Sequence, residues 1–236
     1  MAIKKIRNPF RDLTKFEWCL WLGSMIIVAI SFAFLPEKNY LSLIASLIGV
    51  TALIFIAKGK VIGQFLIIAF ALLYAVVSFR QGYYGEVMTY AGMSAPMAVL
   101  SIISWLKNPY KKTKTVKIKI LEAKHYLIGI GITAVVTVAF YFILGALGTS
   151  NIVFSTMSVA TSFFAVYLTF LRSPYHSVAY LANDLVLIGL WVLASIKNPA
   201  YIPMIICFFV FLANDTYGFI SWKRMEKFQQ KNKGTD

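Results

Sequence analysis

Two copies of one tetrapeptide place acidic and amide side chains inside hydrophobic segments. Leu-Ala-Asn-Asp occurs at 181–184 and again at 212–215. A carboxylate deep in a bilayer costs about 2.5–3.5 kcal/mol on insertion scales, so Asp184 and Asp215 should face the protein interior or a water-filled cavity. The neighbouring amides, Asn183 and Asn214, add hydrogen-bond donors and acceptors. This combination favours a binding site for a polyhydroxylated or cationic solute.

Two other interpretations of the tetrapeptides stay open. The two aspartates are expected at a similar depth on neighbouring antiparallel helices, about 10 Å from the same membrane face at about 1.5 Å per residue. Polar side chains also hold membrane helices together, so the pair could be a clasp between these helices. Membrane carboxylates can also relay protons.

Aromatic residues lie near these polar groups at helical spacing. Tyr180, Asp184 and Trp191 fall on one face of their segment, and Tyr217 follows Asn214 by three positions. Planar rings can enclose a flat heterocycle, and their π-faces attract cations. Packing against neighbouring helices is the alternative role for these aromatic side chains.

The first half of the chain contributes a smaller set of candidates. Gln64, Tyr74 and Tyr90 lie in hydrophobic segments and are expected to contact the solute. Glu86 and Arg80 are expected near the outer surface, where a solvated ion pair contributes little to stability.

The sequence carries no recognised catalytic or metal-binding motif. It has no glycine-rich phosphate loop, no catalytic Cys and His pair and no HExxH pattern. His125 and His176 are isolated and are expected in solvated cytoplasmic loops. No cofactor or metal is predicted. A membrane-embedded enzyme that uses Asp184 and Asp215 on a lipid-linked substrate is the alternative from another functional class.

Composition indicates an integral membrane protein of the all-α class. Hydrophobic residues make up 59% and charged residues 14% of 236 positions, whereas soluble domains have about 25% charged residues. A membrane span needs about 20 mostly apolar residues. Eight segments meet this requirement: 16–35, 40–57, 61–80, 83–106, 126–147, 150–171, 177–196 and 199–222.

The basic residues predict the orientation of these spans. Lysine and arginine accumulate in cytoplasmic loops. With the N-terminus inside, 20 basic residues lie on the cytoplasmic side and three, Lys38, Arg80 and Lys197, lie outside. Both termini are therefore expected in the cytoplasm. Topology and attraction to anionic lipids account for the net charge of +14, and no nucleic-acid partner is expected.

An internal repeat runs through two groups of spans at an offset of 117 residues. Leu73 matches Leu190, Ser78 matches Ser195, and Ile103-Ser104-Trp105 matches Ile220-Ser221-Trp222. Upstream of Leu73 a gap is needed, and Lys58 is aligned with Arg172. Two three-helix units with one helix between them are parallel, which predicts a three-plus-one-plus-three core.

This repeat divides the chain into five regions. They are an N-terminal segment with an extra membrane helix (1–39), a first repeat (40–108), a basic cytoplasmic loop with the linking helix (109–149), a second repeat (150–225) and a cytoplasmic tail (226–236).

Several short motifs in both units resemble those of the Pnu family of bacterial vitamin transporters. They are Tyr84-Gly85-Glu86, Ile103-Ser104-Trp105-Leu106-Lys107-Asn108, Asn214-Asp215-Thr216-Tyr217-Gly218 and Ser221-Trp222. The resemblance covers about 40–225. It implies a fold similar to that of the SWEET sugar transporters, a homotrimer in the bacterial cytoplasmic membrane, and passive movement of an unphosphorylated vitamin that a cytoplasmic kinase then traps.

The resemblance favours nicotinamide riboside as the solute, with thiamine or riboflavin as alternatives. Asn183, Asp184, Asn214 and Asp215 would bind ribose hydroxyls or the amide, and Tyr180, Trp191 and Tyr217 would stack on the pyridinium ring. The family often has tryptophans on the helix that here carries Ser177 and Tyr180, which is a departure from its pattern. The membrane subunit of an ATP-driven vitamin importer fits eight spans and a parallel repeat poorly.

Overall fold

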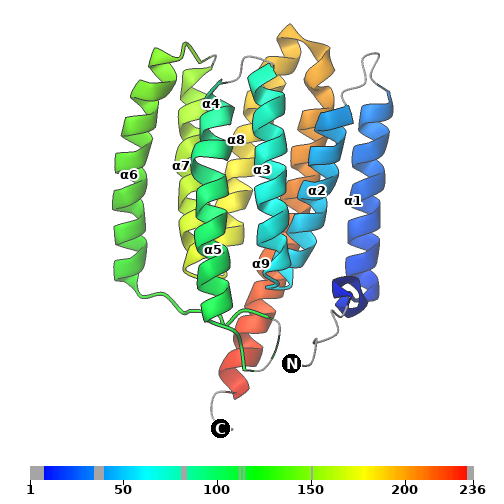
Figure 1. The fold of residues 1–236 in the computed structure, drawn as a ribbon, viewed down its shortest axis with the longest axis vertical. Helices are drawn as coiled ribbons and strands as arrows, with labels where there is room; N and C mark the ends of the chain where they lie inside the picture. Colours follow the sequence, from blue (N-terminus) through cyan, green and yellow to red (C-terminus); the bar gives the residue numbers. More distant parts are fainter. Residues whose placement is uncertain are drawn as a thin grey trace, which may run out of the picture.

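The protein is a bundle of long antiparallel helices in the computed structural model, which describes residues 8–34, 40–80, 84–111, 113, 115–149 and 151–232 (Figure 1). Eight spans in this part are long and apolar enough to cross a membrane, which confirms the predicted number. The helices are α1 (Lys15–Ala33), α2 (Tyr40–Ala57), α3 (Ile62–Arg80), α4 (Tyr84–Val87) with α5 (Ala95–Lys107), α6 (Ala123–Ala146), α7 (Ile152–Phe170), α8 (His176–Lys197) and α9 (Ile202–Lys231).

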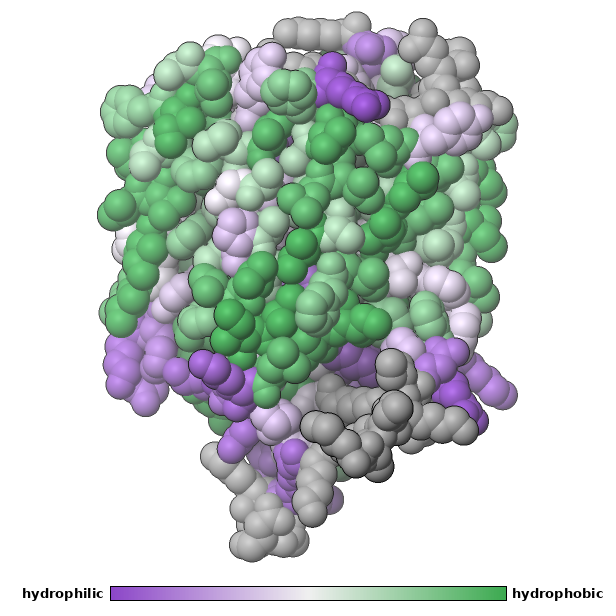
Figure 2. Space-filling model, in the orientation of Figure 1, coloured by the Kyte–Doolittle hydropathy of each residue, from purple (hydrophilic) through white to green (hydrophobic). Residues whose placement is uncertain are grey.

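An apolar belt surrounds the bundle. Hydrophobic side chains cover the middle of the visible face, and hydrophilic residues gather mainly at the end that carries the chain termini (Figure 2). Only 11% of the residues in the most apolar stretch of α6 are buried within the protein. A helix satisfies its own backbone hydrogen bonds, so such segments can expose apolar side chains to lipid. The chain is a multi-pass membrane protein.

Six of the spans form a closed ring. The packing order is α2, α3, α5, α7, α8 and α9, and α9 packs against α2 to close the ring. Outside the ring, α6 packs against α7, whereas α1 packs against both α2 and α9. The site between α8 and α9 is therefore enclosed by helices from both halves of the chain.

Two Ser-Trp dipeptides bond to the ends of helices across this ring. Ser104 Oγ and Trp105 Nε1 on α5 donate to the carbonyls of Phe170 (2.7 Å) and Thr169 (3.0 Å), the last two residues of α7.

The same arrangement recurs between α9 and α2. Ser221 Oγ and Trp222 Nε1 donate to the carbonyls of Ala57 (2.7 Å) and Ile56 (2.8 Å), the last residues of α2. The final carbonyls of a helix have no partner within the helix. The indole rings of Trp105 and Trp222 meet with centroids 5.4 Å apart, so the two contacts also close the bundle at this end.

The turns after α2 and α7 correct the alignment of the repeat. Gly59 and Arg172 both have a φ of +62°, and their backbone N–H groups donate to Ile56 and Thr169 respectively. Gly59 therefore corresponds to Arg172, whereas Lys58 was the predicted match. Glycine adopts this left-handed conformation without the steric cost that arginine incurs.

The fourth span contains a π-helical turn, Met88–Ser94, between α4 and α5. Pro96 lies at the start of α5, and the backbone N–H of Ala95 bonds to the Tyr90 carbonyl, five residues back. Proline cannot donate in a regular helix and its ring collides with the preceding turn. The wide turn accommodates Pro96 and places Tyr90 on an irregular part of the backbone.

The last helix is longer than the sequence analysis predicts. The tail was expected to begin at residue 226, but α9 continues to Lys231. The segment after Trp222 is rich in Lys, Arg, Met, Glu and Gln, which have high helix propensity. An ion pair between Lys223 and Glu226, three positions apart, adds to its stability.

The two Ser-Trp contacts predict paired effects on stability. Trp222→Phe and Trp105→Phe keep an aromatic ring but remove the indole N–H that bonds to a buried carbonyl. The turn N–H groups of Gly59 and Arg172 still donate to these carbonyls, so each variant should destabilise the protein by about 0.5–1.5 kcal/mol. The measurement is the thermal melting midpoint in one detergent, with exposed Phe228→Leu as the control. Wild-type melting of both tryptophan variants would contradict a structural role for these bonds.

Candidate substrate-binding site

A narrow cavity lies inside the ring of helices. Its volume is about 60 Å³, enough for a few water molecules and smaller than a typical ligand pocket of about 300–1,000 Å³. Its lining comes from α2, α3, the π-helical turn, α7, α8 and α9: Leu53, Ile56, Ile67, Phe70, Ala71, Thr89, Tyr90, Ser94, Ser158, Ser162, Tyr180, Asn183, Asp184, Phe208, Phe211 and Asp215. A vitamin could enter only if these side chains or helices moved.

Asp184 on α8 and Asp215 on α9 are the acidic groups of this cavity. They are 3% and 5% exposed, and their carboxyl groups lie within hydrogen-bonding reach of each other. Asp184 Oδ2 is buried without a hydrogen-bond partner in the described structure. Ionised carboxylates only accept hydrogen bonds. A proton or a cation must therefore mediate any favourable contact between the two groups.

Neutral polar side chains extend this acidic centre toward α7. Asn183 lies one position before Asp184, and its Oδ1 accepts a hydrogen bond from Thr161 Oγ1 at 2.9 Å. The amide nitrogen of Asn183 is a donor that suits a hydroxyl or carbonyl oxygen of a ligand. Ser158 and Ser162 add hydroxyl groups from the buried face of α7.

Aromatic rings close the cavity from several helices. Phe70 on α3 lies against Phe211 on α9, with ring centroids 5.8 Å apart, and against Tyr90, 5.7 Å away. Tyr180 on α8 also lines the cavity. Toward the chain termini, cavity-lining Ile56 packs with Trp105 and Trp222. The polar centre is therefore enclosed by rings that can contact a flat ligand.

Five of the ten predicted site residues line this cavity. Four of them come from the second half of the chain and one comes from the first half. Tyr90, Tyr180, Asn183, Asp184 and Asp215 are the five. Their grouping brings the two tetrapeptides together as the sequence analysis expects. Their contact with a solute remains a prediction.

Asn214 and Tyr217 lie outside the cavity lining, on the side of α9 that contacts α1. Asn214 Nδ2 donates to Ser24 Oγ at 2.9 Å and to the Val210 carbonyl at 2.8 Å. Tyr217 donates to Glu17 Oε1 at 2.7 Å. The geometry does not support the predicted solute contacts of these two residues, because neighbouring positions on a helix point to different faces.

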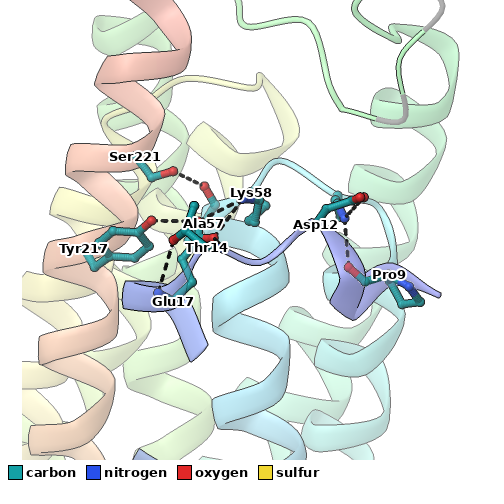
Figure 3. A network of polar contacts seen from close by, with 9 residues as sticks. Pro9, Asp12, Thr14, Glu17, Ala57, Lys58, Tyr217 and Ser221 are labelled. Atoms are coloured by element: carbon teal, nitrogen blue, oxygen red, sulfur yellow. Dashed lines mark hydrogen bonds and ion pairs between the residues drawn. The ribbon is translucent and has the colours of Figure 1, made fainter. Parts of the chain in front are cut away.

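A buried carboxylate organises this second polar region (Figure 3). Glu17 on α1 is 2% exposed and accepts from Lys58 Nζ at 2.9 and 3.0 Å as well as from Tyr217. Thr14 and Glu17 also form a capping box at the start of α1. The extra N-terminal helix is therefore bonded to the end of α2 and to α9.

Gln64, Tyr74 and Trp191 are buried but do not line the cavity. Gln64 lies in the first turn of α3. The ring of Tyr74 is tilted against that of Tyr90, with centroids 4.4 Å apart, and Tyr74 and Trp191 belong to the same buried cluster. These two aromatics pack directly beyond the cavity on the side away from the chain termini.

Two further expectations are wrong in the structure. His176 was expected in a solvated loop, but it is fully buried. Its Nδ1 lies 2.7 Å from the Ser173 carbonyl and its ring packs edge-on against Trp222. Glu86 was expected in water beside Arg80, but it is only 3% exposed.

The serines of α7 and the phenylalanines of the cavity were not predicted from the sequence. The serine signal was present, since Ser155, Ser158, Ser162 and Thr169 recur at spacings of three, four and seven and all face inward. The phenylalanines Phe70, Phe208 and Phe211 gave no such signal, because apolar residues fill every face of α3 and α9.

Comparisons with known proteins agree with this arrangement. The curated nicotinamide riboside transporter PnuC of Neisseria mucosa (strain ATCC 25996 / DSM 4631 / NCTC 10774 / M26) is 27% identical over 227 residues, which cover 94% of this chain and 86% of that protein. The crystal structure of the vitamin B3 transporter PnuC matches with a TM-score of 0.81 and 26% identity, covering 92% of this chain and 94% of the other.

A family model described as nicotinamide mononucleotide transporter matches residues 39–224, which include the ring of helices except for the last two turns of α9. These findings confirm the resemblance to Pnu-type transporters. The chain belongs to the nicotinamide mononucleotide transporter family.

Proposed function

We propose that the protein transports nicotinamide riboside, a vitamin B3 precursor, by facilitated diffusion. The observation that carries this proposal is the pair Asp184 and Asp215 inside an aromatic-lined cavity at the centre of the ring. Carboxylates complement a pyridinium cation and accept hydrogen bonds from ribose hydroxyls. Tyr180 and Phe211 offer ring faces to a flat cation. The relatives named for this solute support the same choice.

The cavity favours the unphosphorylated riboside over the mononucleotide. All the charged groups among its lining residues are acidic, and none of those residues is Lys, Arg or His. A phosphate would add negative charge beside two carboxylates without a cationic partner, and like charges disfavour binding. Trapping by a cytoplasmic kinase after entry is consistent with this selectivity. Thiamine is a second cationic vitamin that such a cavity could accept, and riboflavin is the uncharged alternative.

We further propose that the ring consists of two parallel three-helix units in a SWEET-like, three-plus-one-plus-three arrangement. The units would be 40–108 and 150–225, joined by the loop and helix of 109–149, with 1–39 and 226–236 as the ends. The paired Ser-Trp contacts and the two equivalent turns support this division. Assembly as a homotrimer rests on the family resemblance.

Alternating access would use the two ends of the cavity. Trp105 and Trp222 meet at the end near the termini, where buried Val116 of the basic loop packs against them. Tyr74 and Tyr90 meet at the other end. Relative movement of the two units could separate either aromatic pair around a fixed binding site. This mechanism explains why the cavity is closed and small in this conformation.

Uptake into sealed proteoliposomes tests the proposed solute and the passive mechanism. Labelled nicotinamide riboside should equilibrate, whereas the mononucleotide should enter at least about tenfold more slowly because of its uncompensated phosphate. Thiamine and riboflavin are measured in parallel. Accumulation of unmodified riboside above equilibrium under an imposed pH gradient would refute the passive mechanism.

Substitutions inside and outside the cavity separate binding from helix packing. Asp184→Asn and Asp215→Asn should weaken riboside binding by about 1–3 kcal/mol each, since each loses a charged hydrogen-bond acceptor. Asn214→Ala and Tyr217→Phe should lower the melting temperature and leave affinity close to wild type, because their bonds go to α1. Isothermal titration and melting curves provide the two measurements. Normal affinity in both aspartate variants would exclude the proposed site.

We also propose that the protein lies in the bacterial cytoplasmic membrane with both termini in the cytoplasm. The 20 to three distribution of basic residues supports this orientation. In a background that lacks Cys19 and Cys207, single cysteines at Lys227 and Lys15 should react only with reagent on the inside. Cysteines at Lys38, which is outside the described residues, and at Lys197 should react from the outside. The reverse pattern would invert the topology.

A further inference from the structure

Glu86 is a buried carboxylate at the end of the bundle opposite the termini, in the short helix α4 (Figure 1). It is 3% exposed, and its Oε2 has no hydrogen-bond partner in the described structure. The salt bridges that the described residues form do not include Glu86, and Arg80 is exposed at the end of α3. Glu86 therefore differs from Glu17, which has lysine and tyrosine donors.

The burial of this carboxylate has an energetic cost. Removing an ion from water costs several kcal/mol unless a counter-charge and hydrogen bonds compensate. Intramembrane acidic residues commonly mark the paths of ions and substrates. The free oxygen of Glu86 can thus receive a hydrogen bond or a positive charge from a passing solute.

Two tyrosines connect Glu86 to the cavity. Glu86 precedes Tyr90 by four positions, a spacing that places two side chains on the same side of a helix, and the Tyr90 ring lies 4.4 Å from that of Tyr74. Tyr90 lines the cavity together with Asp184. The order Glu86, Tyr74 with Tyr90, and Asp184 gives alternating acidic and aromatic groups from one end of the bundle to its centre.

We propose that Glu86, Tyr74 and Tyr90 form an entry subsite for an organic cation, which is occupied before the solute reaches Asp184 and Asp215. This inference rests on the proposed transport of a cationic vitamin. The carboxylate would attract the positive charge while the tyrosine rings contact the flat ring of the solute through their π-faces. The tyrosines must then separate to admit the solute to the central cavity.

The second half of the chain has no equivalent of this acidic group. At the offset of 117, Glu86 corresponds to Pro203 and Tyr90 to Cys207. The entry subsite is therefore a property of the first half, whereas Asp184 and Asp215 come from the second. A cation would pass from one half of the ring to the other as it moves inward.

Glu86→Gln tests the subsite, with two solutes that differ in charge. Gln is similar in size to Glu but neutral. Initial uptake of nicotinamide riboside from low concentration into intact cells should fall about tenfold, as expected for lost electrostatic attraction. Uptake of dihydronicotinamide riboside, whose reduced ring is neutral, should stay near the wild-type rate. Glu86→Asp should restore most of the uptake of the cation.

Three controls show whether a change in the uptake by Glu86→Gln comes from the entry subsite. Glu122→Gln removes an exposed carboxylate at the other end of the bundle and should have no effect. The melting temperature of Glu86→Gln should not fall, because the variant buries no charge. Affinity at the central site, measured by titration of purified protein, should change little.

Equal loss of uptake for both solutes, or a wild-type rate for the cation in Glu86→Gln, would overturn the entry subsite. If the proposed transport function is wrong, the wild-type protein itself will transport neither riboside. A wild-type protein that carries both ribosides, with no selective defect in the variant, refutes the subsite alone.

Discussion

The bilayer requires that buried backbone groups find partners within the protein, and the ends of α2 and α7 show how this requirement shapes the ring. Their last carbonyls have no partner in their own helices. Ser221 and Trp222 supply donors to α2, and Ser104 with Trp105 supply them to α7. Because the donors come from helices of the opposite half, each half completes the hydrogen bonding of the other, and both tryptophans meet below the cavity.

This mutual bonding is nearly symmetric, but the chemistry around it is not. The central aspartates belong to α8 and α9 only, and α1 bonds to one of the two junctions between the halves. Glu17 links Lys58 at the end of α2 to Tyr217 on α9. At the junction of α5 with α7 the neighbouring helix is α6, and its described bond to α7 is uncharged, from the Tyr167 hydroxyl to the His125 carbonyl. Movement between the halves would therefore meet more resistance at the α2 and α9 junction, where charge-assisted bonds must break.

The sequence predicted the spans and the central acidic pair because both depend on local patterns. Long apolar runs define the eight helices, and the cost of a carboxylate in lipid forces Asp184 and Asp215 inward. The direction of Asn214 and Tyr217 depended instead on where α1 packs. Their partners on α1, Ser24 and Glu17, are seven positions apart on one face of that helix, but this spacing does not identify α9 as the neighbour. For Glu86 and His176, proximity to a helix end suggested solvent, but tertiary packing buried both.

The energetic cost of burying a carboxylate also distinguishes the acidic residues by role. Glu17 is compensated by a lysine, a tyrosine and the backbone of Thr14, so its environment is sufficient to explain its burial. Asp184 and Glu86 each retain an oxygen without a partner. A site that already contained its own cation would gain little by binding another, because the resident charge would have to be displaced. Acidic groups that stay uncompensated are the ones that can favour a cationic solute, and they lie along the row that leads into the cavity.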